Sequence, residues 1–305
     1  MTNQPAHEYP HPIGDDIQPS PQQAFIDRIL SHTLRYPHVL YCMNNETGEP
    51  VAWSEYWIEH IRKRADEAGR TVHTTDMRRN NDLTAEDHMH IYLDPDRYSF
   101  VDISQNNSDT IGLGEIHWER VIQCRTLLGK HGPRPMNNTK IYSREEGVHV
   151  QAGRRFWRNV FGGCASVRFH RPHPLEGLGG VAEHDQKSFH GLGLHPEAQA
   201  HIRSMRMLAD AIDIVACTPS PGLLTDRDPD EAYCLADAGR VYAIYFPDDS
   251  SVSLDLSAAP ARRFTIEWLA IPESTWTQVT SVTGGGTIHL ESTGGGPRAV
   301  LLRPG

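Results

Sequence analysis

The stretch HVLYCMNNETGEPVAWSEYW, residues 38–57, decides the fold expected for this chain. Its first part is a short apolar run that ends in three polar residues, Asn44, Asn45 and Glu46. Its second part opens an amphipathic helix, predicted over residues 53–68, which Gly69 ends as a C-cap. An apolar strand followed by such a helix is the βα unit of a parallel α/β sheet.

The same βα unit recurs along the chain up to about residue 220. Further strands are predicted over residues 72–77, 100–104, 136–142 and 165–170, and further helices over residues 22–36, 115–128, 154–161 and 196–215. Strands that alternate with helices in this way favour an α/β domain over residues 22–220. Residues 1–21 are polar and proline-rich, so we expect a flexible N-terminal segment there.

After Pro221 the helical periodicity stops and short alternating segments follow. Seven of them are predicted strands: residues 232–236, 241–246, 252–256, 264–269, 276–282, 287–291 and 299–303. Short strands at this spacing predict a small antiparallel β-sandwich over residues 221–305. The triple glycines 284–286 and 294–296 precede no helix, which favours hairpin turns over a phosphate-binding loop.

The composition excludes several classes of function. A net charge of -10 over 305 residues argues against a nucleic-acid partner, which needs a basic surface. The five cysteines include no C-x-x-C pair, so we expect reduced thiols and no metal site, and no motif calls for a cofactor. No apolar run is long enough for a membrane span, and no secretory signal is visible. We therefore expect a cytoplasmic protein, or a secreted or periplasmic one if the N-terminus is truncated.

Polar residues gather where the predicted strands end. In a (β/α) barrel the functional side chains project from these carboxyl ends. The set comprises Asn44, Asn45, Glu46, Asp76, Arg78, Gln105, Asn106, Asn107, Asn138, Lys140, Tyr142, His170 and Arg171. Amides, carboxylates and aromatic rings suit a ligand with many hydroxyl groups, so we predict carbohydrate; the competing interpretation is that these residues cap helices. Trp118, early in its helix, is the predicted sugar-stacking ring.

Asn45-Glu46 at a strand end, followed by Trp53 and Trp57 on the next helix, resembles strand 4 of the large clan A of retaining glycoside hydrolases with TIM barrels. The downstream sequence resembles the branch of that clan whose C-terminal β domain carries the label "collagen-binding". The matching stretches are residues 154–157, 161–163, 204–208, 232–236 and 241–247. The resemblance implies a partial (β/α)8 TIM barrel with strands 4–8, O-glycosyl hydrolase activity, Glu46 as general acid/base and Asn45 as a ligand-binding amide.

The chain departs from this family at the second catalytic carboxylate. A retaining enzyme needs a nucleophile about 5–5.5 Å from the acid, and Lys140 stands where the family places it. Glu145 or Glu146 can substitute, or Asp76 or Asp102 can serve in the wider inverting geometry of about 6.5–9.5 Å. Otherwise the protein is a degenerate glycosidase that binds carbohydrate without hydrolysing it.

Two further predictions concern partners and metals. Five strands cannot close an eight-stranded barrel, so either a longer gene or a partner chain, such as a second copy, is expected to complete it. A weaker alternative is a metal-dependent hydrolase that uses the abundant histidines. Its candidate ligands are His88, His90, His170, His173, His184, His190 and His195. We expect the C-terminal domain either to pack on the barrel as a structural element or to bind carbohydrate itself.

Overall fold

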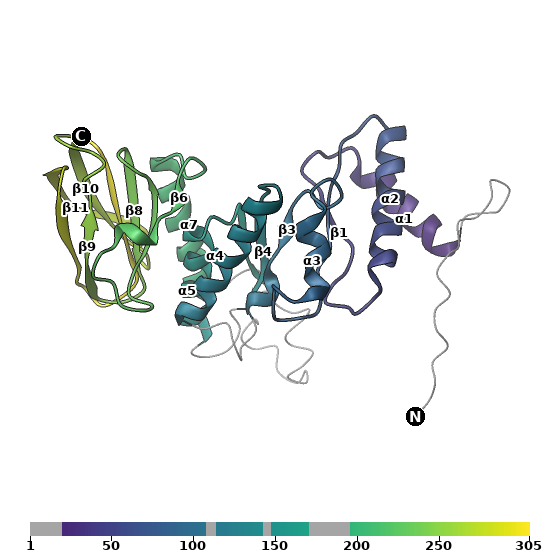
Figure 1. Ribbon diagram of the computed structural model, residues 1–305, viewed down its shortest axis with the longest axis horizontal. Coiled ribbons are helices and arrows are strands. Elements are labelled where there is room, and N and C mark those ends of the chain that lie inside the picture. The colour runs from purple at the N-terminus through teal and green to yellow at the C-terminus, as the bar shows by residue number, and fades with distance from the viewer. Residues whose placement is uncertain (1–19, 108–113, 143–147, 171–195) are drawn as a thin grey trace, which may run out of the picture. The chain divides into compact units, whose positions relative to one another are not determined.

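The computed structural model describes residues 20–107, 114–142, 148–170 and 196–305 (Figure 1). The chain forms two compact units. The first is built from the chain up to residue 80 together with residues 85–101, and the second from residues 81–84 and 102–305. Each unit has its own arrangement of strands and helices.

The first unit alternates helices and short parallel strands. Its elements are α1 (Pro21–Thr33), β1 (Leu40–Cys42), α2 (Val51–Glu67), β2 (His73–Thr75) and α3 (Glu86–Leu93). The Ser20 side chain caps α1, and the Gln23 side chain closes a capping box by accepting from the backbone N–H of Ser20. Strand β1 pairs with β2 in parallel, and α2 buries Trp57, Ile58 and Ile61. The predicted βα units are present, while α3 was not predicted.

The second unit begins with three more strands and their helices. In chain order these are β3 (Val101–Asp102), the 3-10 helix η1 (Ser104–Asn107), α4 (Gly114–His131), β4 (Met136–Tyr142), α5 (Val148–Phe161), β5 (Ser166–His170) and α7 (Pro196–Ala211). Their sheet has the order β3-β4-β5, and β4 runs parallel to β5. The mixed α/β fold is therefore confirmed. The five strands lie in two short sheets, so a partial barrel with one continuous sheet stays a prediction.

The rest of the second unit is antiparallel. It contains β6 (Thr218–Pro219), η2 (Pro221–Leu223), β7 (Tyr233–Asp237), β8 (Val241–Phe246), β9 (Ser250–Asp255), β10 (Arg263–Ala270), β11 (Thr275–Thr283), β12 (Thr287–Ser292) and β13 (Arg298–Pro304). Six strands form a sheet in the order β11-β10-β13-β8-β7-β6, and β12 pairs with β9. All seven segments expected to be strands are strands.

The central strands β7, β8 and β13 of the six-stranded sheet are buried on both faces. Along β7 and β8, Tyr233 and Tyr245 belong to one core with Trp157 of α5, whereas Cys234 and Ile244 belong to a second core with β9 and β12. The alternation follows from the two-residue period of a strand. The antiparallel strands of residues 218–305 are called the β region. Helices α4, α5 and α7 thus share a hydrophobic core with the β region, beside which they lie in Figure 1. Separating the two would expose that core.

Apolar side chains remain exposed on the first unit. Phe25 is 65% exposed, Leu40 is 49% exposed and Ile29 is 38% exposed. They belong to α1 and β1, the first helix and the first strand of the unit. The partner chain or second copy expected to complete a barrel stays a prediction.

Candidate functional site

A buried network lies where β1 and β2 end, within the first unit. Asn44 Nδ2 donates to Asp76 Oδ1 (2.6 Å) and to Ser54 Oγ (2.7 Å), and Ser54 Oγ donates to Asp76 Oδ2 (2.9 Å). His90 Nε2 lies 3.3 Å from Asp76 Oδ2 and Arg78 Nη1 lies 3.5 Å from it. Burial alone would raise the pKa of Asp76, but the hydrogen bonds of His90, Asn44 and Ser54 outweigh it and lower the pKa. Asp76 is an ionised carboxylate that fixes both strand ends.

Glu46 stands directly beyond this network, and its side chain is exposed. Its backbone has a φ of 63°, in the left-handed region that non-glycine residues seldom adopt. The Glu46 N–H donates to the carbonyl of Met77 (3.1 Å), and Thr47 forms an isolated parallel bridge with Arg78. The link between the two strand ends therefore holds Glu46 in a strained conformation. Such strain is concentrated at functional sites in proteins generally.

A ladder of amides lies beside the middle of β4 in the second unit. Asn107 Nδ2 donates to Asn138 Oδ1 (2.6 Å) and to the carbonyl of Lys140 (3.0 Å). Asn138 Nδ2 lies 3.3 Å from Asn159 Oδ1, and His117 Nε2 lies 3.3 Å from Asn107 Oδ1. The pairing of β4 with β5 shifts register between Asn138 and Ile141. The ladder therefore holds in place the irregular part of β4 that carries Lys140. Irregularities of this kind, such as β-bulges, often lie beside functional sites.

Asp102 is a second buried carboxyl, at the end of β3. Its Oδ1 accepts from the Ser104 N–H (2.8 Å), and its Oδ2 accepts from Thr139 Oγ1 (3.1 Å). The residue is 7% exposed. Burial raises the pKa of Asp102, although Ser104, Thr139 and Lys140 act in the opposite direction. Asp102 therefore holds its proton to a higher pH than a free carboxyl, which suits a proton donor better than a nucleophile.

Several residues predicted to contact substrate are instead buried. Asp76, Asn106 and Asn138 are 0% exposed, and their side chains bond to neighbouring protein groups. Trp118 is 3% exposed, and its ring centroid lies 4.7 Å from that of Tyr233 in the core. These four side chains position strand ends or fill the core in the described structure, and direct contact of any of them with sugar stays a prediction.

The remaining predicted residues differ in their accessibility. Asn45 is exposed, His170 is half-buried and Lys140 is 9% exposed. The backbone of Tyr142 ends β4. Glu145 and Glu146 lie outside the described residues.

The histidines expected as alternative metal ligands are only partly described. His88 Nε2 lies 2.8 Å from the carbonyl of Asn80, and burial lowers the pKa of His88. His173, His184, His190 and His195 lie outside the described residues. Over the described ranges, His, Cys, Asp and Glu side chains form no group of three that could hold a metal ion.

Among the helices that the structure describes, none is long and apolar enough to cross a membrane.

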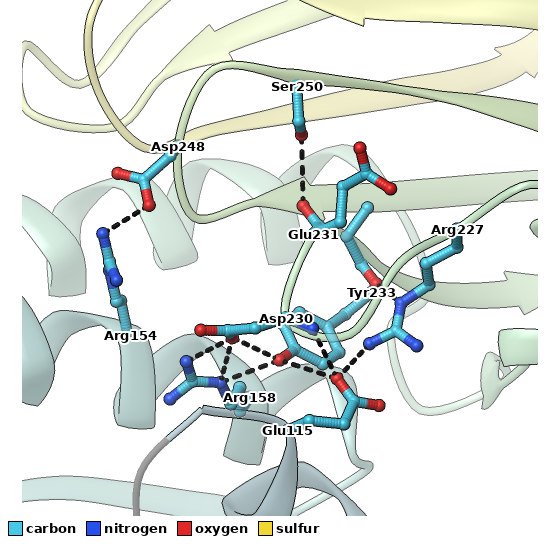
Figure 2. A network of polar contacts seen from close by, with 10 residues as sticks. Glu115, Arg154, Arg158, Arg227, Asp230, Glu231, Tyr233, Asp248 and Ser250 are labelled. Atoms are coloured by element: carbon cyan, nitrogen blue, oxygen red, sulfur yellow. Dashed lines mark hydrogen bonds and ion pairs between the residues drawn. The ribbon is translucent and has the colours of Figure 1, made fainter.

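A charged network that the sequence does not predict joins helices α4 and α5 to the β region (Figure 2). Arg158 of α5 and Glu115 of α4 meet Arg227, Asp230 and Tyr233 of the β region there. Arg227 pairs with Glu115, whose carboxylate also accepts from the Asp230 N–H (2.8 Å). Each helix residue lies 72 or more positions away in sequence from the β-region residue that it contacts, and no local pattern predicts such a contact.

Comparison with known proteins supports a particular class of fold. The chain matches no family model and no curated protein. Among solved structures it is similar to a glycoside hydrolase family 5 protein from Bacteroides vulgatus, with 12% identity and a TM-score of 0.65 over 92% of this chain and 66% of that one. A "putative glycoside hydrolase" from Bacteroides vulgatus has 12% identity and a TM-score of 0.60 over 93% of this chain and 55% of that one. A conserved exported protein from Bacteroides fragilis has 10% identity and a TM-score of 0.56 over 92% of this chain and 68% of that one.

Identities this low establish the fold alone. The fold is that of glycoside hydrolases, and the chain spans between 55% and 68% of the length of these three structures. No nucleic-acid or membrane partner is indicated by these similarities.

Proposed function

We propose that this chain is a glycoside hydrolase-like protein that acts on carbohydrate, with Glu46 as its general acid/base. The observation that carries the proposal is the place of Glu46 in a fold shared with glycoside hydrolases. Glu46 lies in the loop that follows β1, is exposed, and is held with a φ of 63° beyond the buried Asp76 network. A carboxyl at a strand end is where a barrel enzyme presents its catalytic groups.

In the proposed reaction, the Glu46 carboxyl gives its proton to the glycosidic oxygen as the bond from that oxygen to the anomeric carbon breaks. A water molecule then bonds through its oxygen to the anomeric carbon and gives one of its protons to a carboxylate. Exposed Asn45 is proposed to donate to a sugar hydroxyl. The resemblance leaves the second carboxylate open among Glu145, Glu146, Asp76 and Asp102. Asp76 and Asp102 are buried, and Glu145 and Glu146 lie outside the described residues.

A non-catalytic carbohydrate-binding protein is the second candidate function. It is favoured by Lys140, which stands in β4 where the resemblance expects the nucleophile and is 9% exposed. An ammonium group cannot form a glycosyl ester. Such a protein would use the same strand ends to bind an oligosaccharide without cleaving it.

The experiment compares Glu46→Gln with Glu49→Gln, a matched change in the same exposed loop. Both variants and the parent chain are assayed for release of nitrophenol from a panel of aryl glycosides, and for oligosaccharide binding by calorimetry. We expect the parent and Glu49→Gln to release nitrophenol and Glu46→Gln to lose at least about a hundredfold in rate. Full activity in Glu46→Gln would exclude Glu46 as the acid. Sugar binding without turnover in the parent would establish the binding protein instead.

We further propose that the β region is a structural support for the helices. Its two tryptophans are committed to packing, since Trp268 is 7% exposed in one core and Trp276 packs against the other. Independent sugar binding by this region needs an exposed aromatic platform, which these two side chains do not provide.

A further inference from the structure

A cavity of about 550 Å³ lies in the second unit, where α5 and the start of α7 meet loops of the β region. Its size is that of a small-molecule site. Much of its wall is apolar and rigid, because four proline rings line it: Pro196, Pro247, Pro272 and Pro297. Among the described residues, none that is proposed to act on carbohydrate lines it, and Glu46 is not part of its wall.

His201 supplies the first polar group of the cavity and is 9% exposed. The Trp157 indole can only donate a hydrogen bond, and its Nε1 lies 2.9 Å from His201 Nδ1. Nδ1 must therefore be the acceptor, and the proton of the neutral ring lies on Nε2. Burial lowers the pKa of His201 to about 4, so the ring is neutral at physiological pH. Its Nε2–H makes no hydrogen bond to any residue that the structure describes.

Tyr245 supplies the second polar group. It is 0% exposed, it lines the cavity, and its ring stacks on Trp157 with centroids 5.4 Å apart. Its hydroxyl is a buried group with no hydrogen-bond partner among the described residues. Burial raises the pKa of Tyr245, so the hydroxyl keeps its proton and remains a donor. An unsatisfied buried hydroxyl costs free energy, which a bound acceptor would recover.

The donors around the cavity favour a ligand that accepts hydrogen bonds. Arg154 Nη2 pairs with Asp248 Oδ2, as Figure 2 shows, while the buried Arg154 Nε has no partner within the described ranges. Arg203 adds a positive charge, and the positive end of α7 begins at Pro196. Glu197, in the first turn of α7, and Asp248 also line the cavity, so two carboxylates balance the two arginines and a bound carboxylate would be held by the donors.

We propose that this cavity binds a small organic carboxylate, with its apolar body against the proline rings and its carboxylate near the His201, Tyr245 and Arg154 donors. The site is independent of the proposed sugar chemistry. The described residues that line it all belong to the second unit.

The test is calorimetric titration of the full chain with phenylacetate and with the neutral phenylacetamide. Tyr245→Phe removes only the unpartnered hydroxyl, so this variant should fold as stably as the parent and bind phenylacetate at least about tenfold more weakly. Tyr242→Phe is the matched control, because Tyr242 lies on the opposite face of β8, where its hydroxyl accepts from the Gly239 N–H. That variant should bind phenylacetate like the parent.

Phenylacetate binding that depends on Tyr245 and exceeds phenylacetamide binding supports the proposal. Equal binding of both compounds overturns the carboxylate assignment. Binding that Tyr245→Phe leaves unchanged overturns the site, and no binding of phenylacetate at about 10 mM, far above the usual range of specific sites, overturns the proposal as a whole.

Discussion

Arg158 and Asp230 join α5 to the β region through a buried guanidinium. Arg158 Nη2 lies 2.5 Å from Asp230 Oδ1, and Arg158 Nε lies 3.1 Å from the same oxygen and 3.0 Å from Tyr233 Oη. The Arg158 side chain is 0% exposed and that of Asp230 is 29% exposed. The Arg158 end of the pair is therefore shielded from solvent, whereas the Asp230 end is partly exposed.

Replacing Arg158 with Met is expected to lower the free energy of unfolding by about 3–5 kcal/mol, because it leaves Asp230 without its partner in a mostly buried place. Chemical denaturation followed by circular dichroism measures this loss. Arg240→Met is the control, since Arg240 is 71% exposed and pairs with Asp237 on the surface. Its effect should stay below about 1 kcal/mol. Similar losses in both variants would contradict a special role for Arg158.

The sequence was sufficient to predict the order of most elements. β8 was predicted at its observed bounds, and the remaining predicted strands overlap observed ones, because alternation and turn residues are local signals. The helix α3 was missed because His88 and His90 obscure its apolar face. The charged network around Arg158 could not be predicted either, because its members come together only through packing of α4 and α5 on the large sheet.

The roles of the predicted site residues stay a prediction, and the structure adds how their side chains are packed. Asp76 follows β2 and Asn138 lies within β4, and both bond inside the protein; polarity in a sequence cannot distinguish an accessible side chain from one that does so. The same limit applies to the prediction that Trp118 contacts sugar, because its position early in α4 is compatible with either face of the helix. Only tertiary packing decides which side chains a ligand can reach.

The neutral His201 ring predicts a pH dependence of stability. The folded chain lowers the pKa of His201 to about 4 from an ordinary value of 6.5. Between these values the unfolded state binds a proton that the folded state excludes, so the contribution is complete above pH 6.5 and is lost as the pH falls toward 4. The full loss should be on the order of 3 kcal/mol, of which about 2 kcal/mol falls between pH 7 and pH 5. Denaturation of the parent and of His201→Gln at pH 7 and pH 5 measures it, and an equal pH dependence in both would contradict the assignment.

Gly153 of α5 allows the close approach of His201. A Cβ atom at Gly153 would lie 2.2 Å from His201 Nε2 and 2.6 Å from its Cε1. Gly153→Ala is therefore expected to destabilise the fold by about 1–3 kcal/mol. The control is Gly129→Ala in α4, where no atom lies within 4 Å of the added methyl group and helix propensity should stabilise by up to about 1 kcal/mol. Thermal unfolding of both variants should give shifts of opposite sign; a stabilised Gly153→Ala would show that α5 and α7 can move apart.

The left-handed backbone of Glu46 makes a distinct prediction for the proposed catalytic residue. Glycine adopts a φ of 63° without strain, so Glu46→Gly is expected to retain or raise the free energy of unfolding, by about 1 kcal/mol at most. Glu46→Gln keeps the strain and should leave stability unchanged. Both should lose aryl-glycoside hydrolysis if the carboxyl is the proton donor. A stable but inactive Glu46→Gly would show that the chain keeps a strained glutamate at some cost in stability, which a solely structural residue would not explain. A clearly destabilised Glu46→Gly would instead show that its side chain supports the fold.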